Sequence, residues 1–147
     1  MIIDASALLP AFFPDESNQA KVQALIQAHV LRSLRLAAPM LLTYEVTNAV
    51  LQGVRRGRIS LSTGEEILSV FGNLGLHLHT PPSDRIFALA HRFDRSAYDA
   101  AYLALAEHLR QPLLTGDRRL YNAVQGQLSW VLWIDDYQPP AILENLQ

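Results

Sequence analysis

The chain has 147 residues, 50% of them hydrophobic and none of them cysteine, and its formal charge is −2. This size and composition suit a continuous apolar core, so we expect residues 1–147 to form a single domain. The lack of cysteine excludes disulfides, thiolate zinc sites and cysteine nucleophiles. No basic leader or membrane-length apolar run is visible, so a soluble, cytoplasmic protein without membrane contact is expected.

The charge balance argues against a general polyanion-binding protein, since nucleic-acid-binding domains often have isoelectric points above about 9. However, 11 of the 12 basic residues are arginine. The planar guanidinium group binds phosphate oxygens in a forked geometry that lysine lacks. The arginine bias therefore fits a phosphate-containing ligand, although genome composition would explain it equally well.

Hydrophobic spacing predicts an alternation of short strands and helices along the chain. Strands are predicted at residues 1–4, 34–38, 76–80, 112–115 and 130–134. Helices are predicted at residues 6–13, 17–32, 42–56, 62–74, 83–93 and 97–109, with a further short helix starting at 117. Ser17 is a candidate N-cap, Pro10 should bend the first helix, and Gly57 and Gly75 should end two others. From Asp135 onward we expect a loop-like tail.

Short apolar strands that alternate with helices indicate an α/β fold. We expect a three-layer α/β/α arrangement around a central, mainly parallel sheet of about five strands. In such sheets ligands bind beyond the carboxyl ends of the strands. Polar residues just after the predicted strands are therefore candidate site residues.

Two aspartates occur at this position. Asp4 ends the first predicted strand, and Asp117 comes two residues after the strand at 112–115. Both belong at the carboxyl edge of the sheet, but Asp is also a preferred N-cap at a strand-to-helix turn. For either residue taken alone, helix capping is the simpler interpretation.

Asp99 lies early in a predicted helix that is apolar almost all the way round, from residue 97 to 106. A buried, ionised carboxylate needs a cationic partner, a proton or a metal ion. The alternative is a partly solvated acid in the first helical turn, where the helix dipole stabilises it. The sequence favours neither interpretation over the other.

Glu45 lies near the start of the helix at 42–56, opposite its apolar stripe. Asn48 follows it by three residues on the same face, and Arg55 and Arg56 extend this face toward the end of the helix. A solvated polar face is the simplest explanation. A carboxylate, an amide and guanidinium groups in one row would also suit a metal ion and RNA phosphates.

Several carboxylates that meet at one sheet edge repel one another, and hard divalent cations stabilise such clusters. Mg²⁺ or Mn²⁺ is the expected cofactor. A cation of this kind activates water and neutralises phosphate charge, so phosphodiester hydrolysis is the natural chemistry.

The sequence also resembles a known family, the PIN domains, and among them the VapC-like toxins of toxin–antitoxin pairs. The resemblance spans nearly the whole chain and rests on four blocks in order: residues 2–8 (IIDASAL), 44–49 (YEVTNA), 98–106 (YDAAYLALA) and 113–117 (LLTGD). Each block is weak alone, but their order and spacing are specific.

The resemblance implies a metal-dependent endoribonuclease whose catalytic, metal-holding acids fall on Asp4, Glu45, Asp99 and Asp117. Ser6 and Thr115 match small hydroxyl positions beside these acids and, with Asn48, could support the metal through hydrogen bonds. Further candidates for RNA binding are Arg55, Arg56, Arg118 and Arg119. Members of the family are usually homodimers inhibited by a small antitoxin protein.

Other functions remain possible from the sequence. A PIN fold could serve as a non-catalytic RNA- or protein-binding module, or as a solitary RNA-processing nuclease. Receiver-type phosphoryl-transfer domains need a lysine near a later strand end, and the only lysine here is Lys21. Dehalogenase-type enzymes need an Asp-x-Asp motif, but Asp4 is followed by Ala5 and Ser6.

For the histidines and tryptophans we expect structural roles rather than roles in a functional site. His77 and His79 alternate on one strand but lack further zinc ligands nearby, so a polar strand face is expected. His29 is expected to be peripheral. Trp130 and Trp133 should pack beside an apolar strand, although an exposed one could stack on a base.

Overall fold

The strands pair in parallel throughout the part of the chain that the computed structural model describes, residues 1–141. Within these residues five strands form one sheet in the order β3-β2-β1-β4-β5. Each strand pairs in parallel with its neighbours. The strands are β1 Ile2–Ile3, β2 Ala37–Pro39, β3 His77–His79, β4 Leu113–Thr115 and β5 Val131–Trp133. The predicted sheet is therefore confirmed, with strands shorter than expected.

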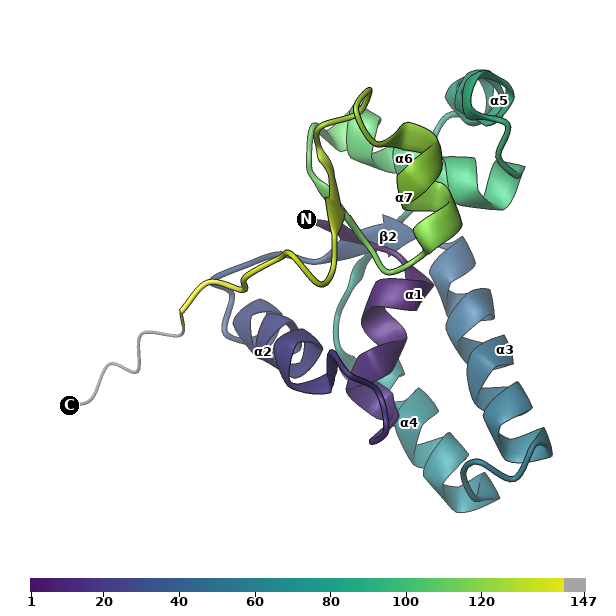
Figure 1. Cartoon of the computed structure of the whole chain (residues 1–147). Helices are drawn as coiled ribbons and strands as arrows, with labels where there is room; N and C mark the ends of the chain where they lie inside the picture. The colour runs from purple at the N-terminus through teal and green to yellow at the C-terminus, as the bar shows by residue number, and fades with distance from the viewer. Residues whose placement is uncertain (142–147) are drawn as a thin grey trace.

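Helices cover both faces of this sheet. They are α1 Ala5–Leu8, the 3-10 helix η1 Leu9–Phe12, α2 Gln19–Val30, α3 Leu41–Arg55, α4 Leu61–Asn73, α5 Ser83–Phe93, α6 Ala97–Leu109 and α7 Arg118–Val124. Right-handed crossovers put α1 to α4 on one face and α5 to α7 on the other, as Figure 1 shows on the two sides of β2. The three-layer α/β/α arrangement is thus confirmed. None of the helices in residues 1–141 is long and apolar enough to cross a membrane.

The ends of several elements follow from local chemistry, and one predicted cap is wrong. Gly57 and Gly75 adopt positive φ angles just beyond α3 and α4, as expected. The N-cap residue of α2 is Asn18 rather than Ser17, and its side chain makes no capping bond. Its amide instead donates to Asp135 Oδ1 at 2.8 Å, which ties α2 to the segment after β5. The tail from Asp135 is loop-like through residue 141, and residues 142–147 lie outside the described part.

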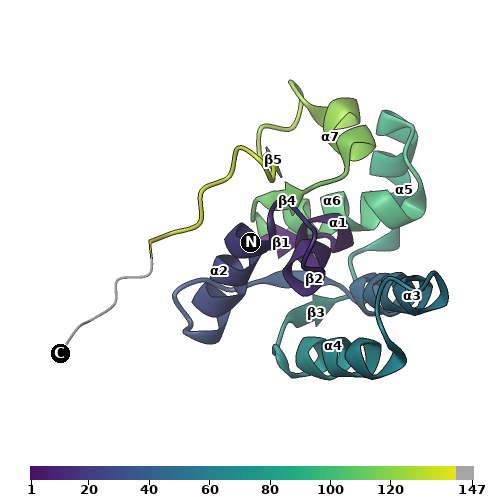
Figure 2. The same ribbon diagram turned by 60° about the horizontal axis from the view of Figure 1, so that its bottom comes forward.

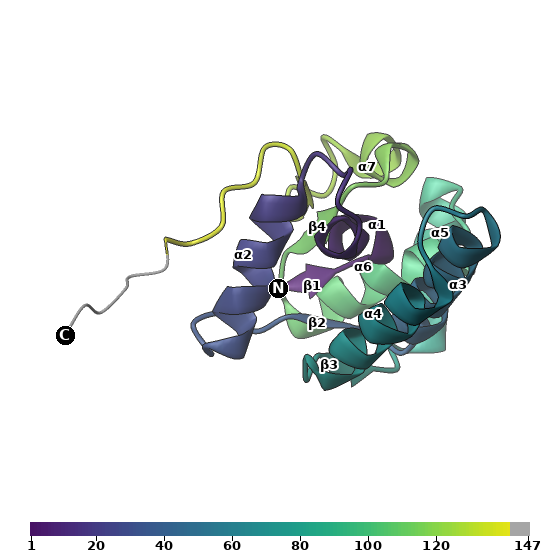
Figure 3. The ribbon, with the colours of Figure 1, turned by 90° about the horizontal axis from the view of Figure 1, so that it is seen from below.

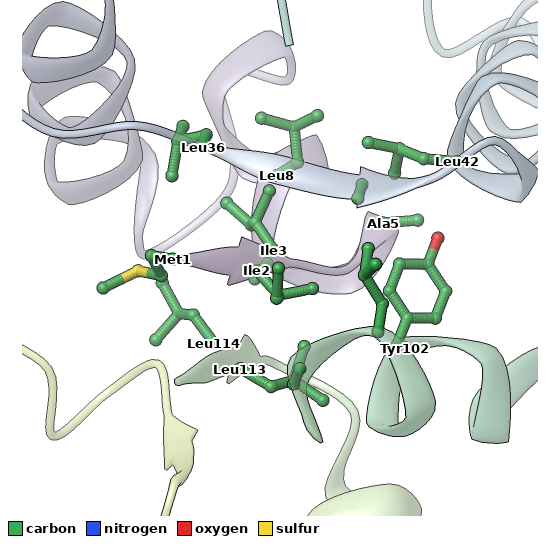
Figure 4. Packing of buried hydrophobic residues seen from close by; sticks show 14 of the residues in the cluster. Met1, Ile2, Ile3, Ala5, Leu8, Leu36, Leu42, Tyr102, Leu113 and Leu114 are labelled. Atoms are coloured by element: carbon green, nitrogen blue, oxygen red, sulfur yellow. The ribbon is translucent and has the colours of Figure 1, made fainter. Parts of the chain in front are cut away.

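The core lies between the sheet and its helices. Ile2, Ile3, Leu113 and Leu114, from the adjacent strands β1 and β4, are fully buried. Figure 4 shows this cluster with the Tyr102 ring of α6 beside it. As its composition predicts, α6 is buried on most of its surface, and it contacts β1, β2 and β4. Because α6 runs antiparallel to the strands, its first turn lies at their carboxyl ends.

The chain reverses its winding direction between β1 and β4. After β1 it passes into α1 on one face, and after β4 it passes into α7 on the other face. The carboxyl ends of β1 and β4 are therefore the topological switch point of the sheet, and ligands of open α/β sheets bind outside such a point. We call this place, outside the carboxyl ends of β1 and β4, the crevice. Asp4 directly follows β1 and Asp117 comes two residues after β4, so both lie at this end of the sheet.

Helices α3 and α4 lie side by side (Figures 2 and 3). Gly64 of α4 is buried against α3, and a Cβ added there would lie 2.9 Å from Val54 Cγ2 and 3.2 Å from Val50 Cγ1. These distances are shorter than ordinary contacts between carbon atoms. Glycine at this position therefore permits the close approach of the two helices.

We predict that Gly64→Ala lowers the free energy of unfolding by about 1–3 kcal/mol, because its methyl group overpacks the α3–α4 contact. Gly72 is a matched control, since it lies in the same helix and a Cβ there meets nothing within 4 Å. Gly72→Ala should leave stability unchanged or raise it by up to about 1 kcal/mol. Urea unfolding of both variants measures the difference, and equal stabilities would refute the close packing.

Candidate active site

Asp4 directly follows β1 and is 5% exposed. Its Oδ1 accepts hydrogen bonds from the Ala7 backbone N–H at 2.9 Å and from Ser6 Oγ at 2.5 Å. Its Oδ2 accepts one from the hydroxyl of Thr115, the last residue of β4. The N-cap interpretation is therefore correct for α1, but the second oxygen reaches across to the neighbouring strand.

Burial raises the pKa of Asp4 to about 6. The hydrogen bonds from Ser6, Thr115 and Ala7 oppose this shift, whereas the charge of Asp117 adds to it. Desolvation outweighs the donors because the carboxyl group is enclosed by the core. At neutral pH Asp4 is therefore an ionised but costly group, which a nearby cation would stabilise.

Asp117 lies across the crevice, at the start of α7. Its Oδ1 accepts hydrogen bonds from the backbone N–H groups of Arg119 at 2.9 Å and Leu120 at 3.3 Å. Its own N–H donates to Thr115 Oγ1 at 3.0 Å. Asp117 is thus also a true N-cap, and Thr115 connects it to Asp4.

The hydroxyl of Ser6 closes this network. It accepts a hydrogen bond from the Gly116 N–H at 2.9 Å while it donates to Asp4. A Cβ on Gly116 would lie 3.1 Å from the backbone oxygen of Ser6, so the two loops pass very close to each other. Ser6 and Thr115 thereby hold the loops after β1 and β4 together around Asp4.

Asp99 lies in the first turn of α6, whose N-cap Ser96 accepts a hydrogen bond from the Asp99 N–H at 3.1 Å. It is partly buried, as the helix-dipole interpretation expects. Burial raises its pKa and so does the charge of Asp117, while Arg95 lowers it. Within residues 1–141 the Asp99 carboxylate accepts no hydrogen bond, so its oxygens remain available.

Glu45 lies in the second turn of α3 and is partly buried, so it is not part of a fully solvated face. Its Oε1 accepts a hydrogen bond of 2.5 Å from Tyr102 Oη. Burial raises the pKa of Glu45, the Tyr102 hydroxyl lowers it, and the charges of Asp99 and Asp117 raise it. Glu45 therefore belongs to the same electrostatic cluster.

Tyr102 is the residue that sequence reasoning missed. The residue is 3% exposed, and its hydroxyl lies on the side of Leu42 in α3 (Figure 4). Burial raises its pKa, with the bond to Glu45 and the charges of Glu45, Asp4 and Asp99 adding to the effect. One signal was available, because Tyr102 follows Asp99 by three residues and so shares its helix face.

The charge of Asp117 contributes to the raised pKa of each of the other three predicted acids, which connects the four electrostatically. None of them forms a salt bridge with a residue in the range 1–141, where the salt bridges are those of Arg58 and Arg85 with other acids. Oxygen donors of this kind suit Mg²⁺ or Mn²⁺. The donor set therefore fits a hard divalent cation.

The side chains do not form a finished cage. Within the described residues no three Asp, Glu or His side chains are arranged closely enough to hold a metal ion. Asp4, Glu45 and Asp117 instead direct an oxygen at a hydrogen-bond donor of the protein. To coordinate one ion together, these carboxylates would have to move from the positions described here.

The remaining candidates are exposed on the two helices α3 and α7 or at their ends. Asn48, Arg55 and Arg56 are exposed along α3, beyond Glu45. Arg118 and Arg119 are exposed at the start of α7, and the Arg118 guanidinium lies 4.1 Å from the centre of the Trp133 ring. Trp133 is partly buried and also packs against Tyr121, consistent with the predicted packing role.

His29 is not peripheral, contrary to the sequence prediction. It is 8% exposed, and its Nδ1 accepts a hydrogen bond from the Leu36 N–H at 3.0 Å. Its Nε2 faces the carbonyl oxygens of Leu74 and Gly75 at 3.0 and 3.2 Å. A histidine can bridge three backbone groups in this way because it has both an acceptor and a donor nitrogen.

Comparison with known proteins agrees with this arrangement. Residues 1–125 match the family profile of the PIN domain. The chain is 36% identical over 124 residues to Ribonuclease VapC3 of Pyrobaculum aerophilum, covering 82% of this chain and 91% of that protein. It is 32% identical over 129 residues to VapC ribonuclease Mb0985 of Mycobacterium bovis, covering 86% and 93%.

The fold has a counterpart among solved structures. The crystal structure of PAE2754 from Pyrobaculum aerophilum superposes with a TM-score of 0.70 at 26% identity, over 91% of this chain and 90% of that one. The parallel sheet, the crevice between β1 and β4 and the match over residues 1–125 agree with one another. The chain therefore belongs to the PIN-domain family.

Proposed function

We propose that the chain is a metal-dependent endoribonuclease that hydrolyses RNA phosphodiester bonds, and the toxin of a toxin–antitoxin pair. The observation that supports this most is the gathering of Asp4, Glu45, Asp99 and Asp117 around one crevice without basic salt-bridge partners among residues 1–141. The names of the relatives, which are VapC ribonucleases, point the same way. The proposal takes residues 1–147 as a single nuclease domain.

In this proposal the four acids are the catalytic residues and bind Mg²⁺ or Mn²⁺. When bound, the cation supplies charge neutralisation for the scissile phosphate and a lowered pKa for water. Asp99 is the acid whose oxygens accept no hydrogen bond from residues 1–141, so it is the one best able to contact ligand without rearrangement. Ser6 and Thr115 orient Asp4, and Tyr102 orients Glu45.

RNA would lie along the rim of the crevice. Arg55 and Arg56 at the end of α3, and Arg118 and Arg119 at the start of α7, are exposed cations on the two helices at which Glu45 and Asp117 lie. Their guanidinium groups would bind backbone phosphates, while Asn48 would donate to an oxygen near Glu45. Such contacts hold the polyanion next to the carboxylates, which would repel it by themselves.

Exposed apolar side chains support the expectation that this chain binds partner proteins. Tyr44, Phe87 and Tyr98, on α3, α5 and α6, are 75%, 77% and 67% exposed. Large apolar groups left in water at this level often mark interaction surfaces. We include a homodimer and a cognate antitoxin in the proposal on this ground.

A second candidate function is a non-catalytic PIN module. One observation favours it: within residues 1–141, no three acids are already arranged around a possible metal position. The two candidates differ in whether the acids are needed for RNA cleavage.

We predict that Asp99→Asn abolishes Mg²⁺- or Mn²⁺-dependent RNA cleavage while the protein stays folded. The substitution removes the charge without breaking a side-chain hydrogen bond within residues 1–141. Asp84→Asn is a matched control, because Asp84 occupies the first turn of α5 as Asp99 occupies that of α6. If a gel assay shows equal cleavage by Asp99→Asn and the parent, the nuclease site is assigned incorrectly.

A second prediction concerns pH and the metal-free state. The pKa of Asp4 is about 6 in the folded chain and ordinarily 3.8, so folding is favoured by its protonation. The stability that protonated Asp4 contributes to the folded state is fully present below about pH 4, and it is lost as the pH rises through 6. In EDTA, the difference in Tm between Asp4→Asn and the parent should therefore increase from pH 4 to pH 7.

Divalent cations should reverse this loss in the parent. At pH 7, Mn²⁺ at about 100 times its dissociation constant should stabilise the parent by about 2.7 kcal/mol. It should stabilise Asp4→Asn much less, because one carboxylate is missing. Thermal unfolding with and without Mn²⁺ measures both effects, and an identical Mn²⁺ response of the two proteins would exclude Asp4 as a ligand.

Tyr102→Phe tests the orienting role of the buried hydroxyl. Loss of a group that orients a metal ligand typically costs about 10–100-fold in metal affinity or activity. We expect the half-saturating Mn²⁺ concentration for cleavage to rise by about 10-fold or more, with much of the rate recovered at saturating Mn²⁺. Tyr98→Phe, an exposed position on the same helix, should leave this concentration unchanged. A uniform loss of rate at every Mn²⁺ concentration would instead mean that Tyr102 does not act through the metal.

A further inference from the structure

A basic groove lies at the opposite edge of the sheet from the four acids. It consists of two adjoining cavities, with volumes of about 430 and 540 Å³, that share Arg35 and His77. We call it the amino-edge groove, because it follows the segments that enter β2 and β3. Its polar lining residues include Arg32, Arg35, Asn73, His77, His79 and Gln111. Figure 3 shows that the chain enters β2 from the lower end of α2 and leaves it toward α3 on the other side.

The lining of the amino-edge groove is cationic. Among residues 1–141, no aspartate or glutamate lines either cavity. Arg32 and Arg35 are exposed, and within residues 1–141 neither forms a salt bridge, unlike Arg58 and Arg85. Two arginines are therefore available in a chain whose overall charge is −2.

The groove is held in shape by the buried side chain of His29. Its ring links the Leu36 N–H, just before β2, to the carbonyls of Leu74 and Gly75, just after α4. These two segments line the groove or adjoin it. Because Nδ1 accepts and Nε2 faces carbonyl oxygens, the ring is in its neutral Nε2–H form. It therefore serves as a structural brace between the two walls.

The loop that carries the two arginines is also fixed. Arg32 adopts a left-handed conformation with φ of 61°, and its N–H donates to the His29 carbonyl at 3.0 Å. The next residue, Ser33, donates from both its N–H and its hydroxyl to the Ala28 carbonyl. Arg32 and Arg35 thus extend from a backbone that is already ordered, which lowers the entropic cost of ligand binding.

We propose that the amino-edge groove binds backbone phosphates of the RNA substrate, outside the site of cleavage. The inference rests on the proposed nuclease function. Arginine forks suit phosphate oxygens, and the side chains of Asn73 and Gln111 can add neutral donors. The walls of the groove are partly apolar, and the larger cavity more so, so polarity alone does not select its ligand. The two arginines without salt bridges, and the lack of acids among the lining residues from 1–141, favour a phosphate backbone. RNA long enough to span both sheet edges gains affinity from the groove, and short RNA does not.

The test compares Arg32→Gln/Arg35→Gln with the parent in EDTA, where cleavage does not interfere. Fluorescence anisotropy measures binding of single-stranded RNAs of about 30 and about 6 nucleotides. For the long RNA, log Kd of the double variant should depend less steeply on log salt, with a slope reduced by about 1.4 for two lost phosphate contacts. Arg92→Gln is the control, because Arg92 is exposed on α5 and lines neither cavity.

A cleavage assay with Mn²⁺ gives an independent readout. The double variant should have a higher KM for the long RNA, an unchanged kcat, and unchanged kinetics with the short RNA. This pattern separates a remote binding site from damage to the catalytic site. A fall in kcat for both RNAs would contradict the proposal.

Other outcomes would also overturn it. One is an unaltered salt slope in the double variant, and another is an equal change in Arg92→Gln. A groove that binds inorganic phosphate or poly-glutamate through Arg32 and Arg35, with RNA binding unaffected, would be a site for small anions or for acidic peptides. The two proposals can fail separately. If RNA binds through the groove but is never cut, only the nuclease proposal is contradicted. If RNA is cut and the Arg32→Gln/Arg35→Gln variant behaves like the parent, only the groove proposal is contradicted.

Discussion

The burial of the Asp4 carboxylate at a sheet edge that it shares with three other acids is the constraint on which the rest of the structure depends. Asp4 is enclosed by the core, and its pKa is raised to about 6 even though Ser6, Thr115 and Ala7 donate to it. A fold that keeps such a group needs compensating stability, which the buried β1 and β4 strands and the apolar helix α6 supply. Because carboxylate oxygens are the preferred ligands of hard divalent cations, a bound cation of this kind would stabilise the cluster.

Much of the fold and the positions of the four acids could be predicted from the sequence, because both depend on local relations. Asp4 and Asp117 come within two residues of the ends of short apolar strands, and the carboxyl ends of parallel strands share one edge. Asp99 stands out as an acid in an otherwise apolar helix. The capping interpretations were also correct, since Asp4 and Asp117 cap α1 and α7 while they line the crevice.

Relations that depend on tertiary distance were not predictable. The bond between Tyr102 and Glu45 joins α6 to α3 across 57 residues of sequence. His29 looked peripheral because its partners, Leu36, Leu74 and Gly75, belong to other segments. Ser17 was the more obvious N-cap, yet Asn18 takes that position and bonds to Asp135 instead. The arrangement of carboxylates around an ion was likewise beyond the sequence, and within residues 1–141 it is not preformed.

The central claim is that these four carboxylates coexist because they share a divalent cation. The most direct measurement is the anomalous diffraction of crystals soaked in Mn²⁺. We expect a manganese peak in the crevice between β1 and β4, within coordination distance of oxygens from Asp4 and Asp99, with Glu45 or Asp117 turned toward it. A Mn²⁺-saturated crystal with no peak there, and with the carboxylates still bonded to Thr115 and Tyr102, would contradict it.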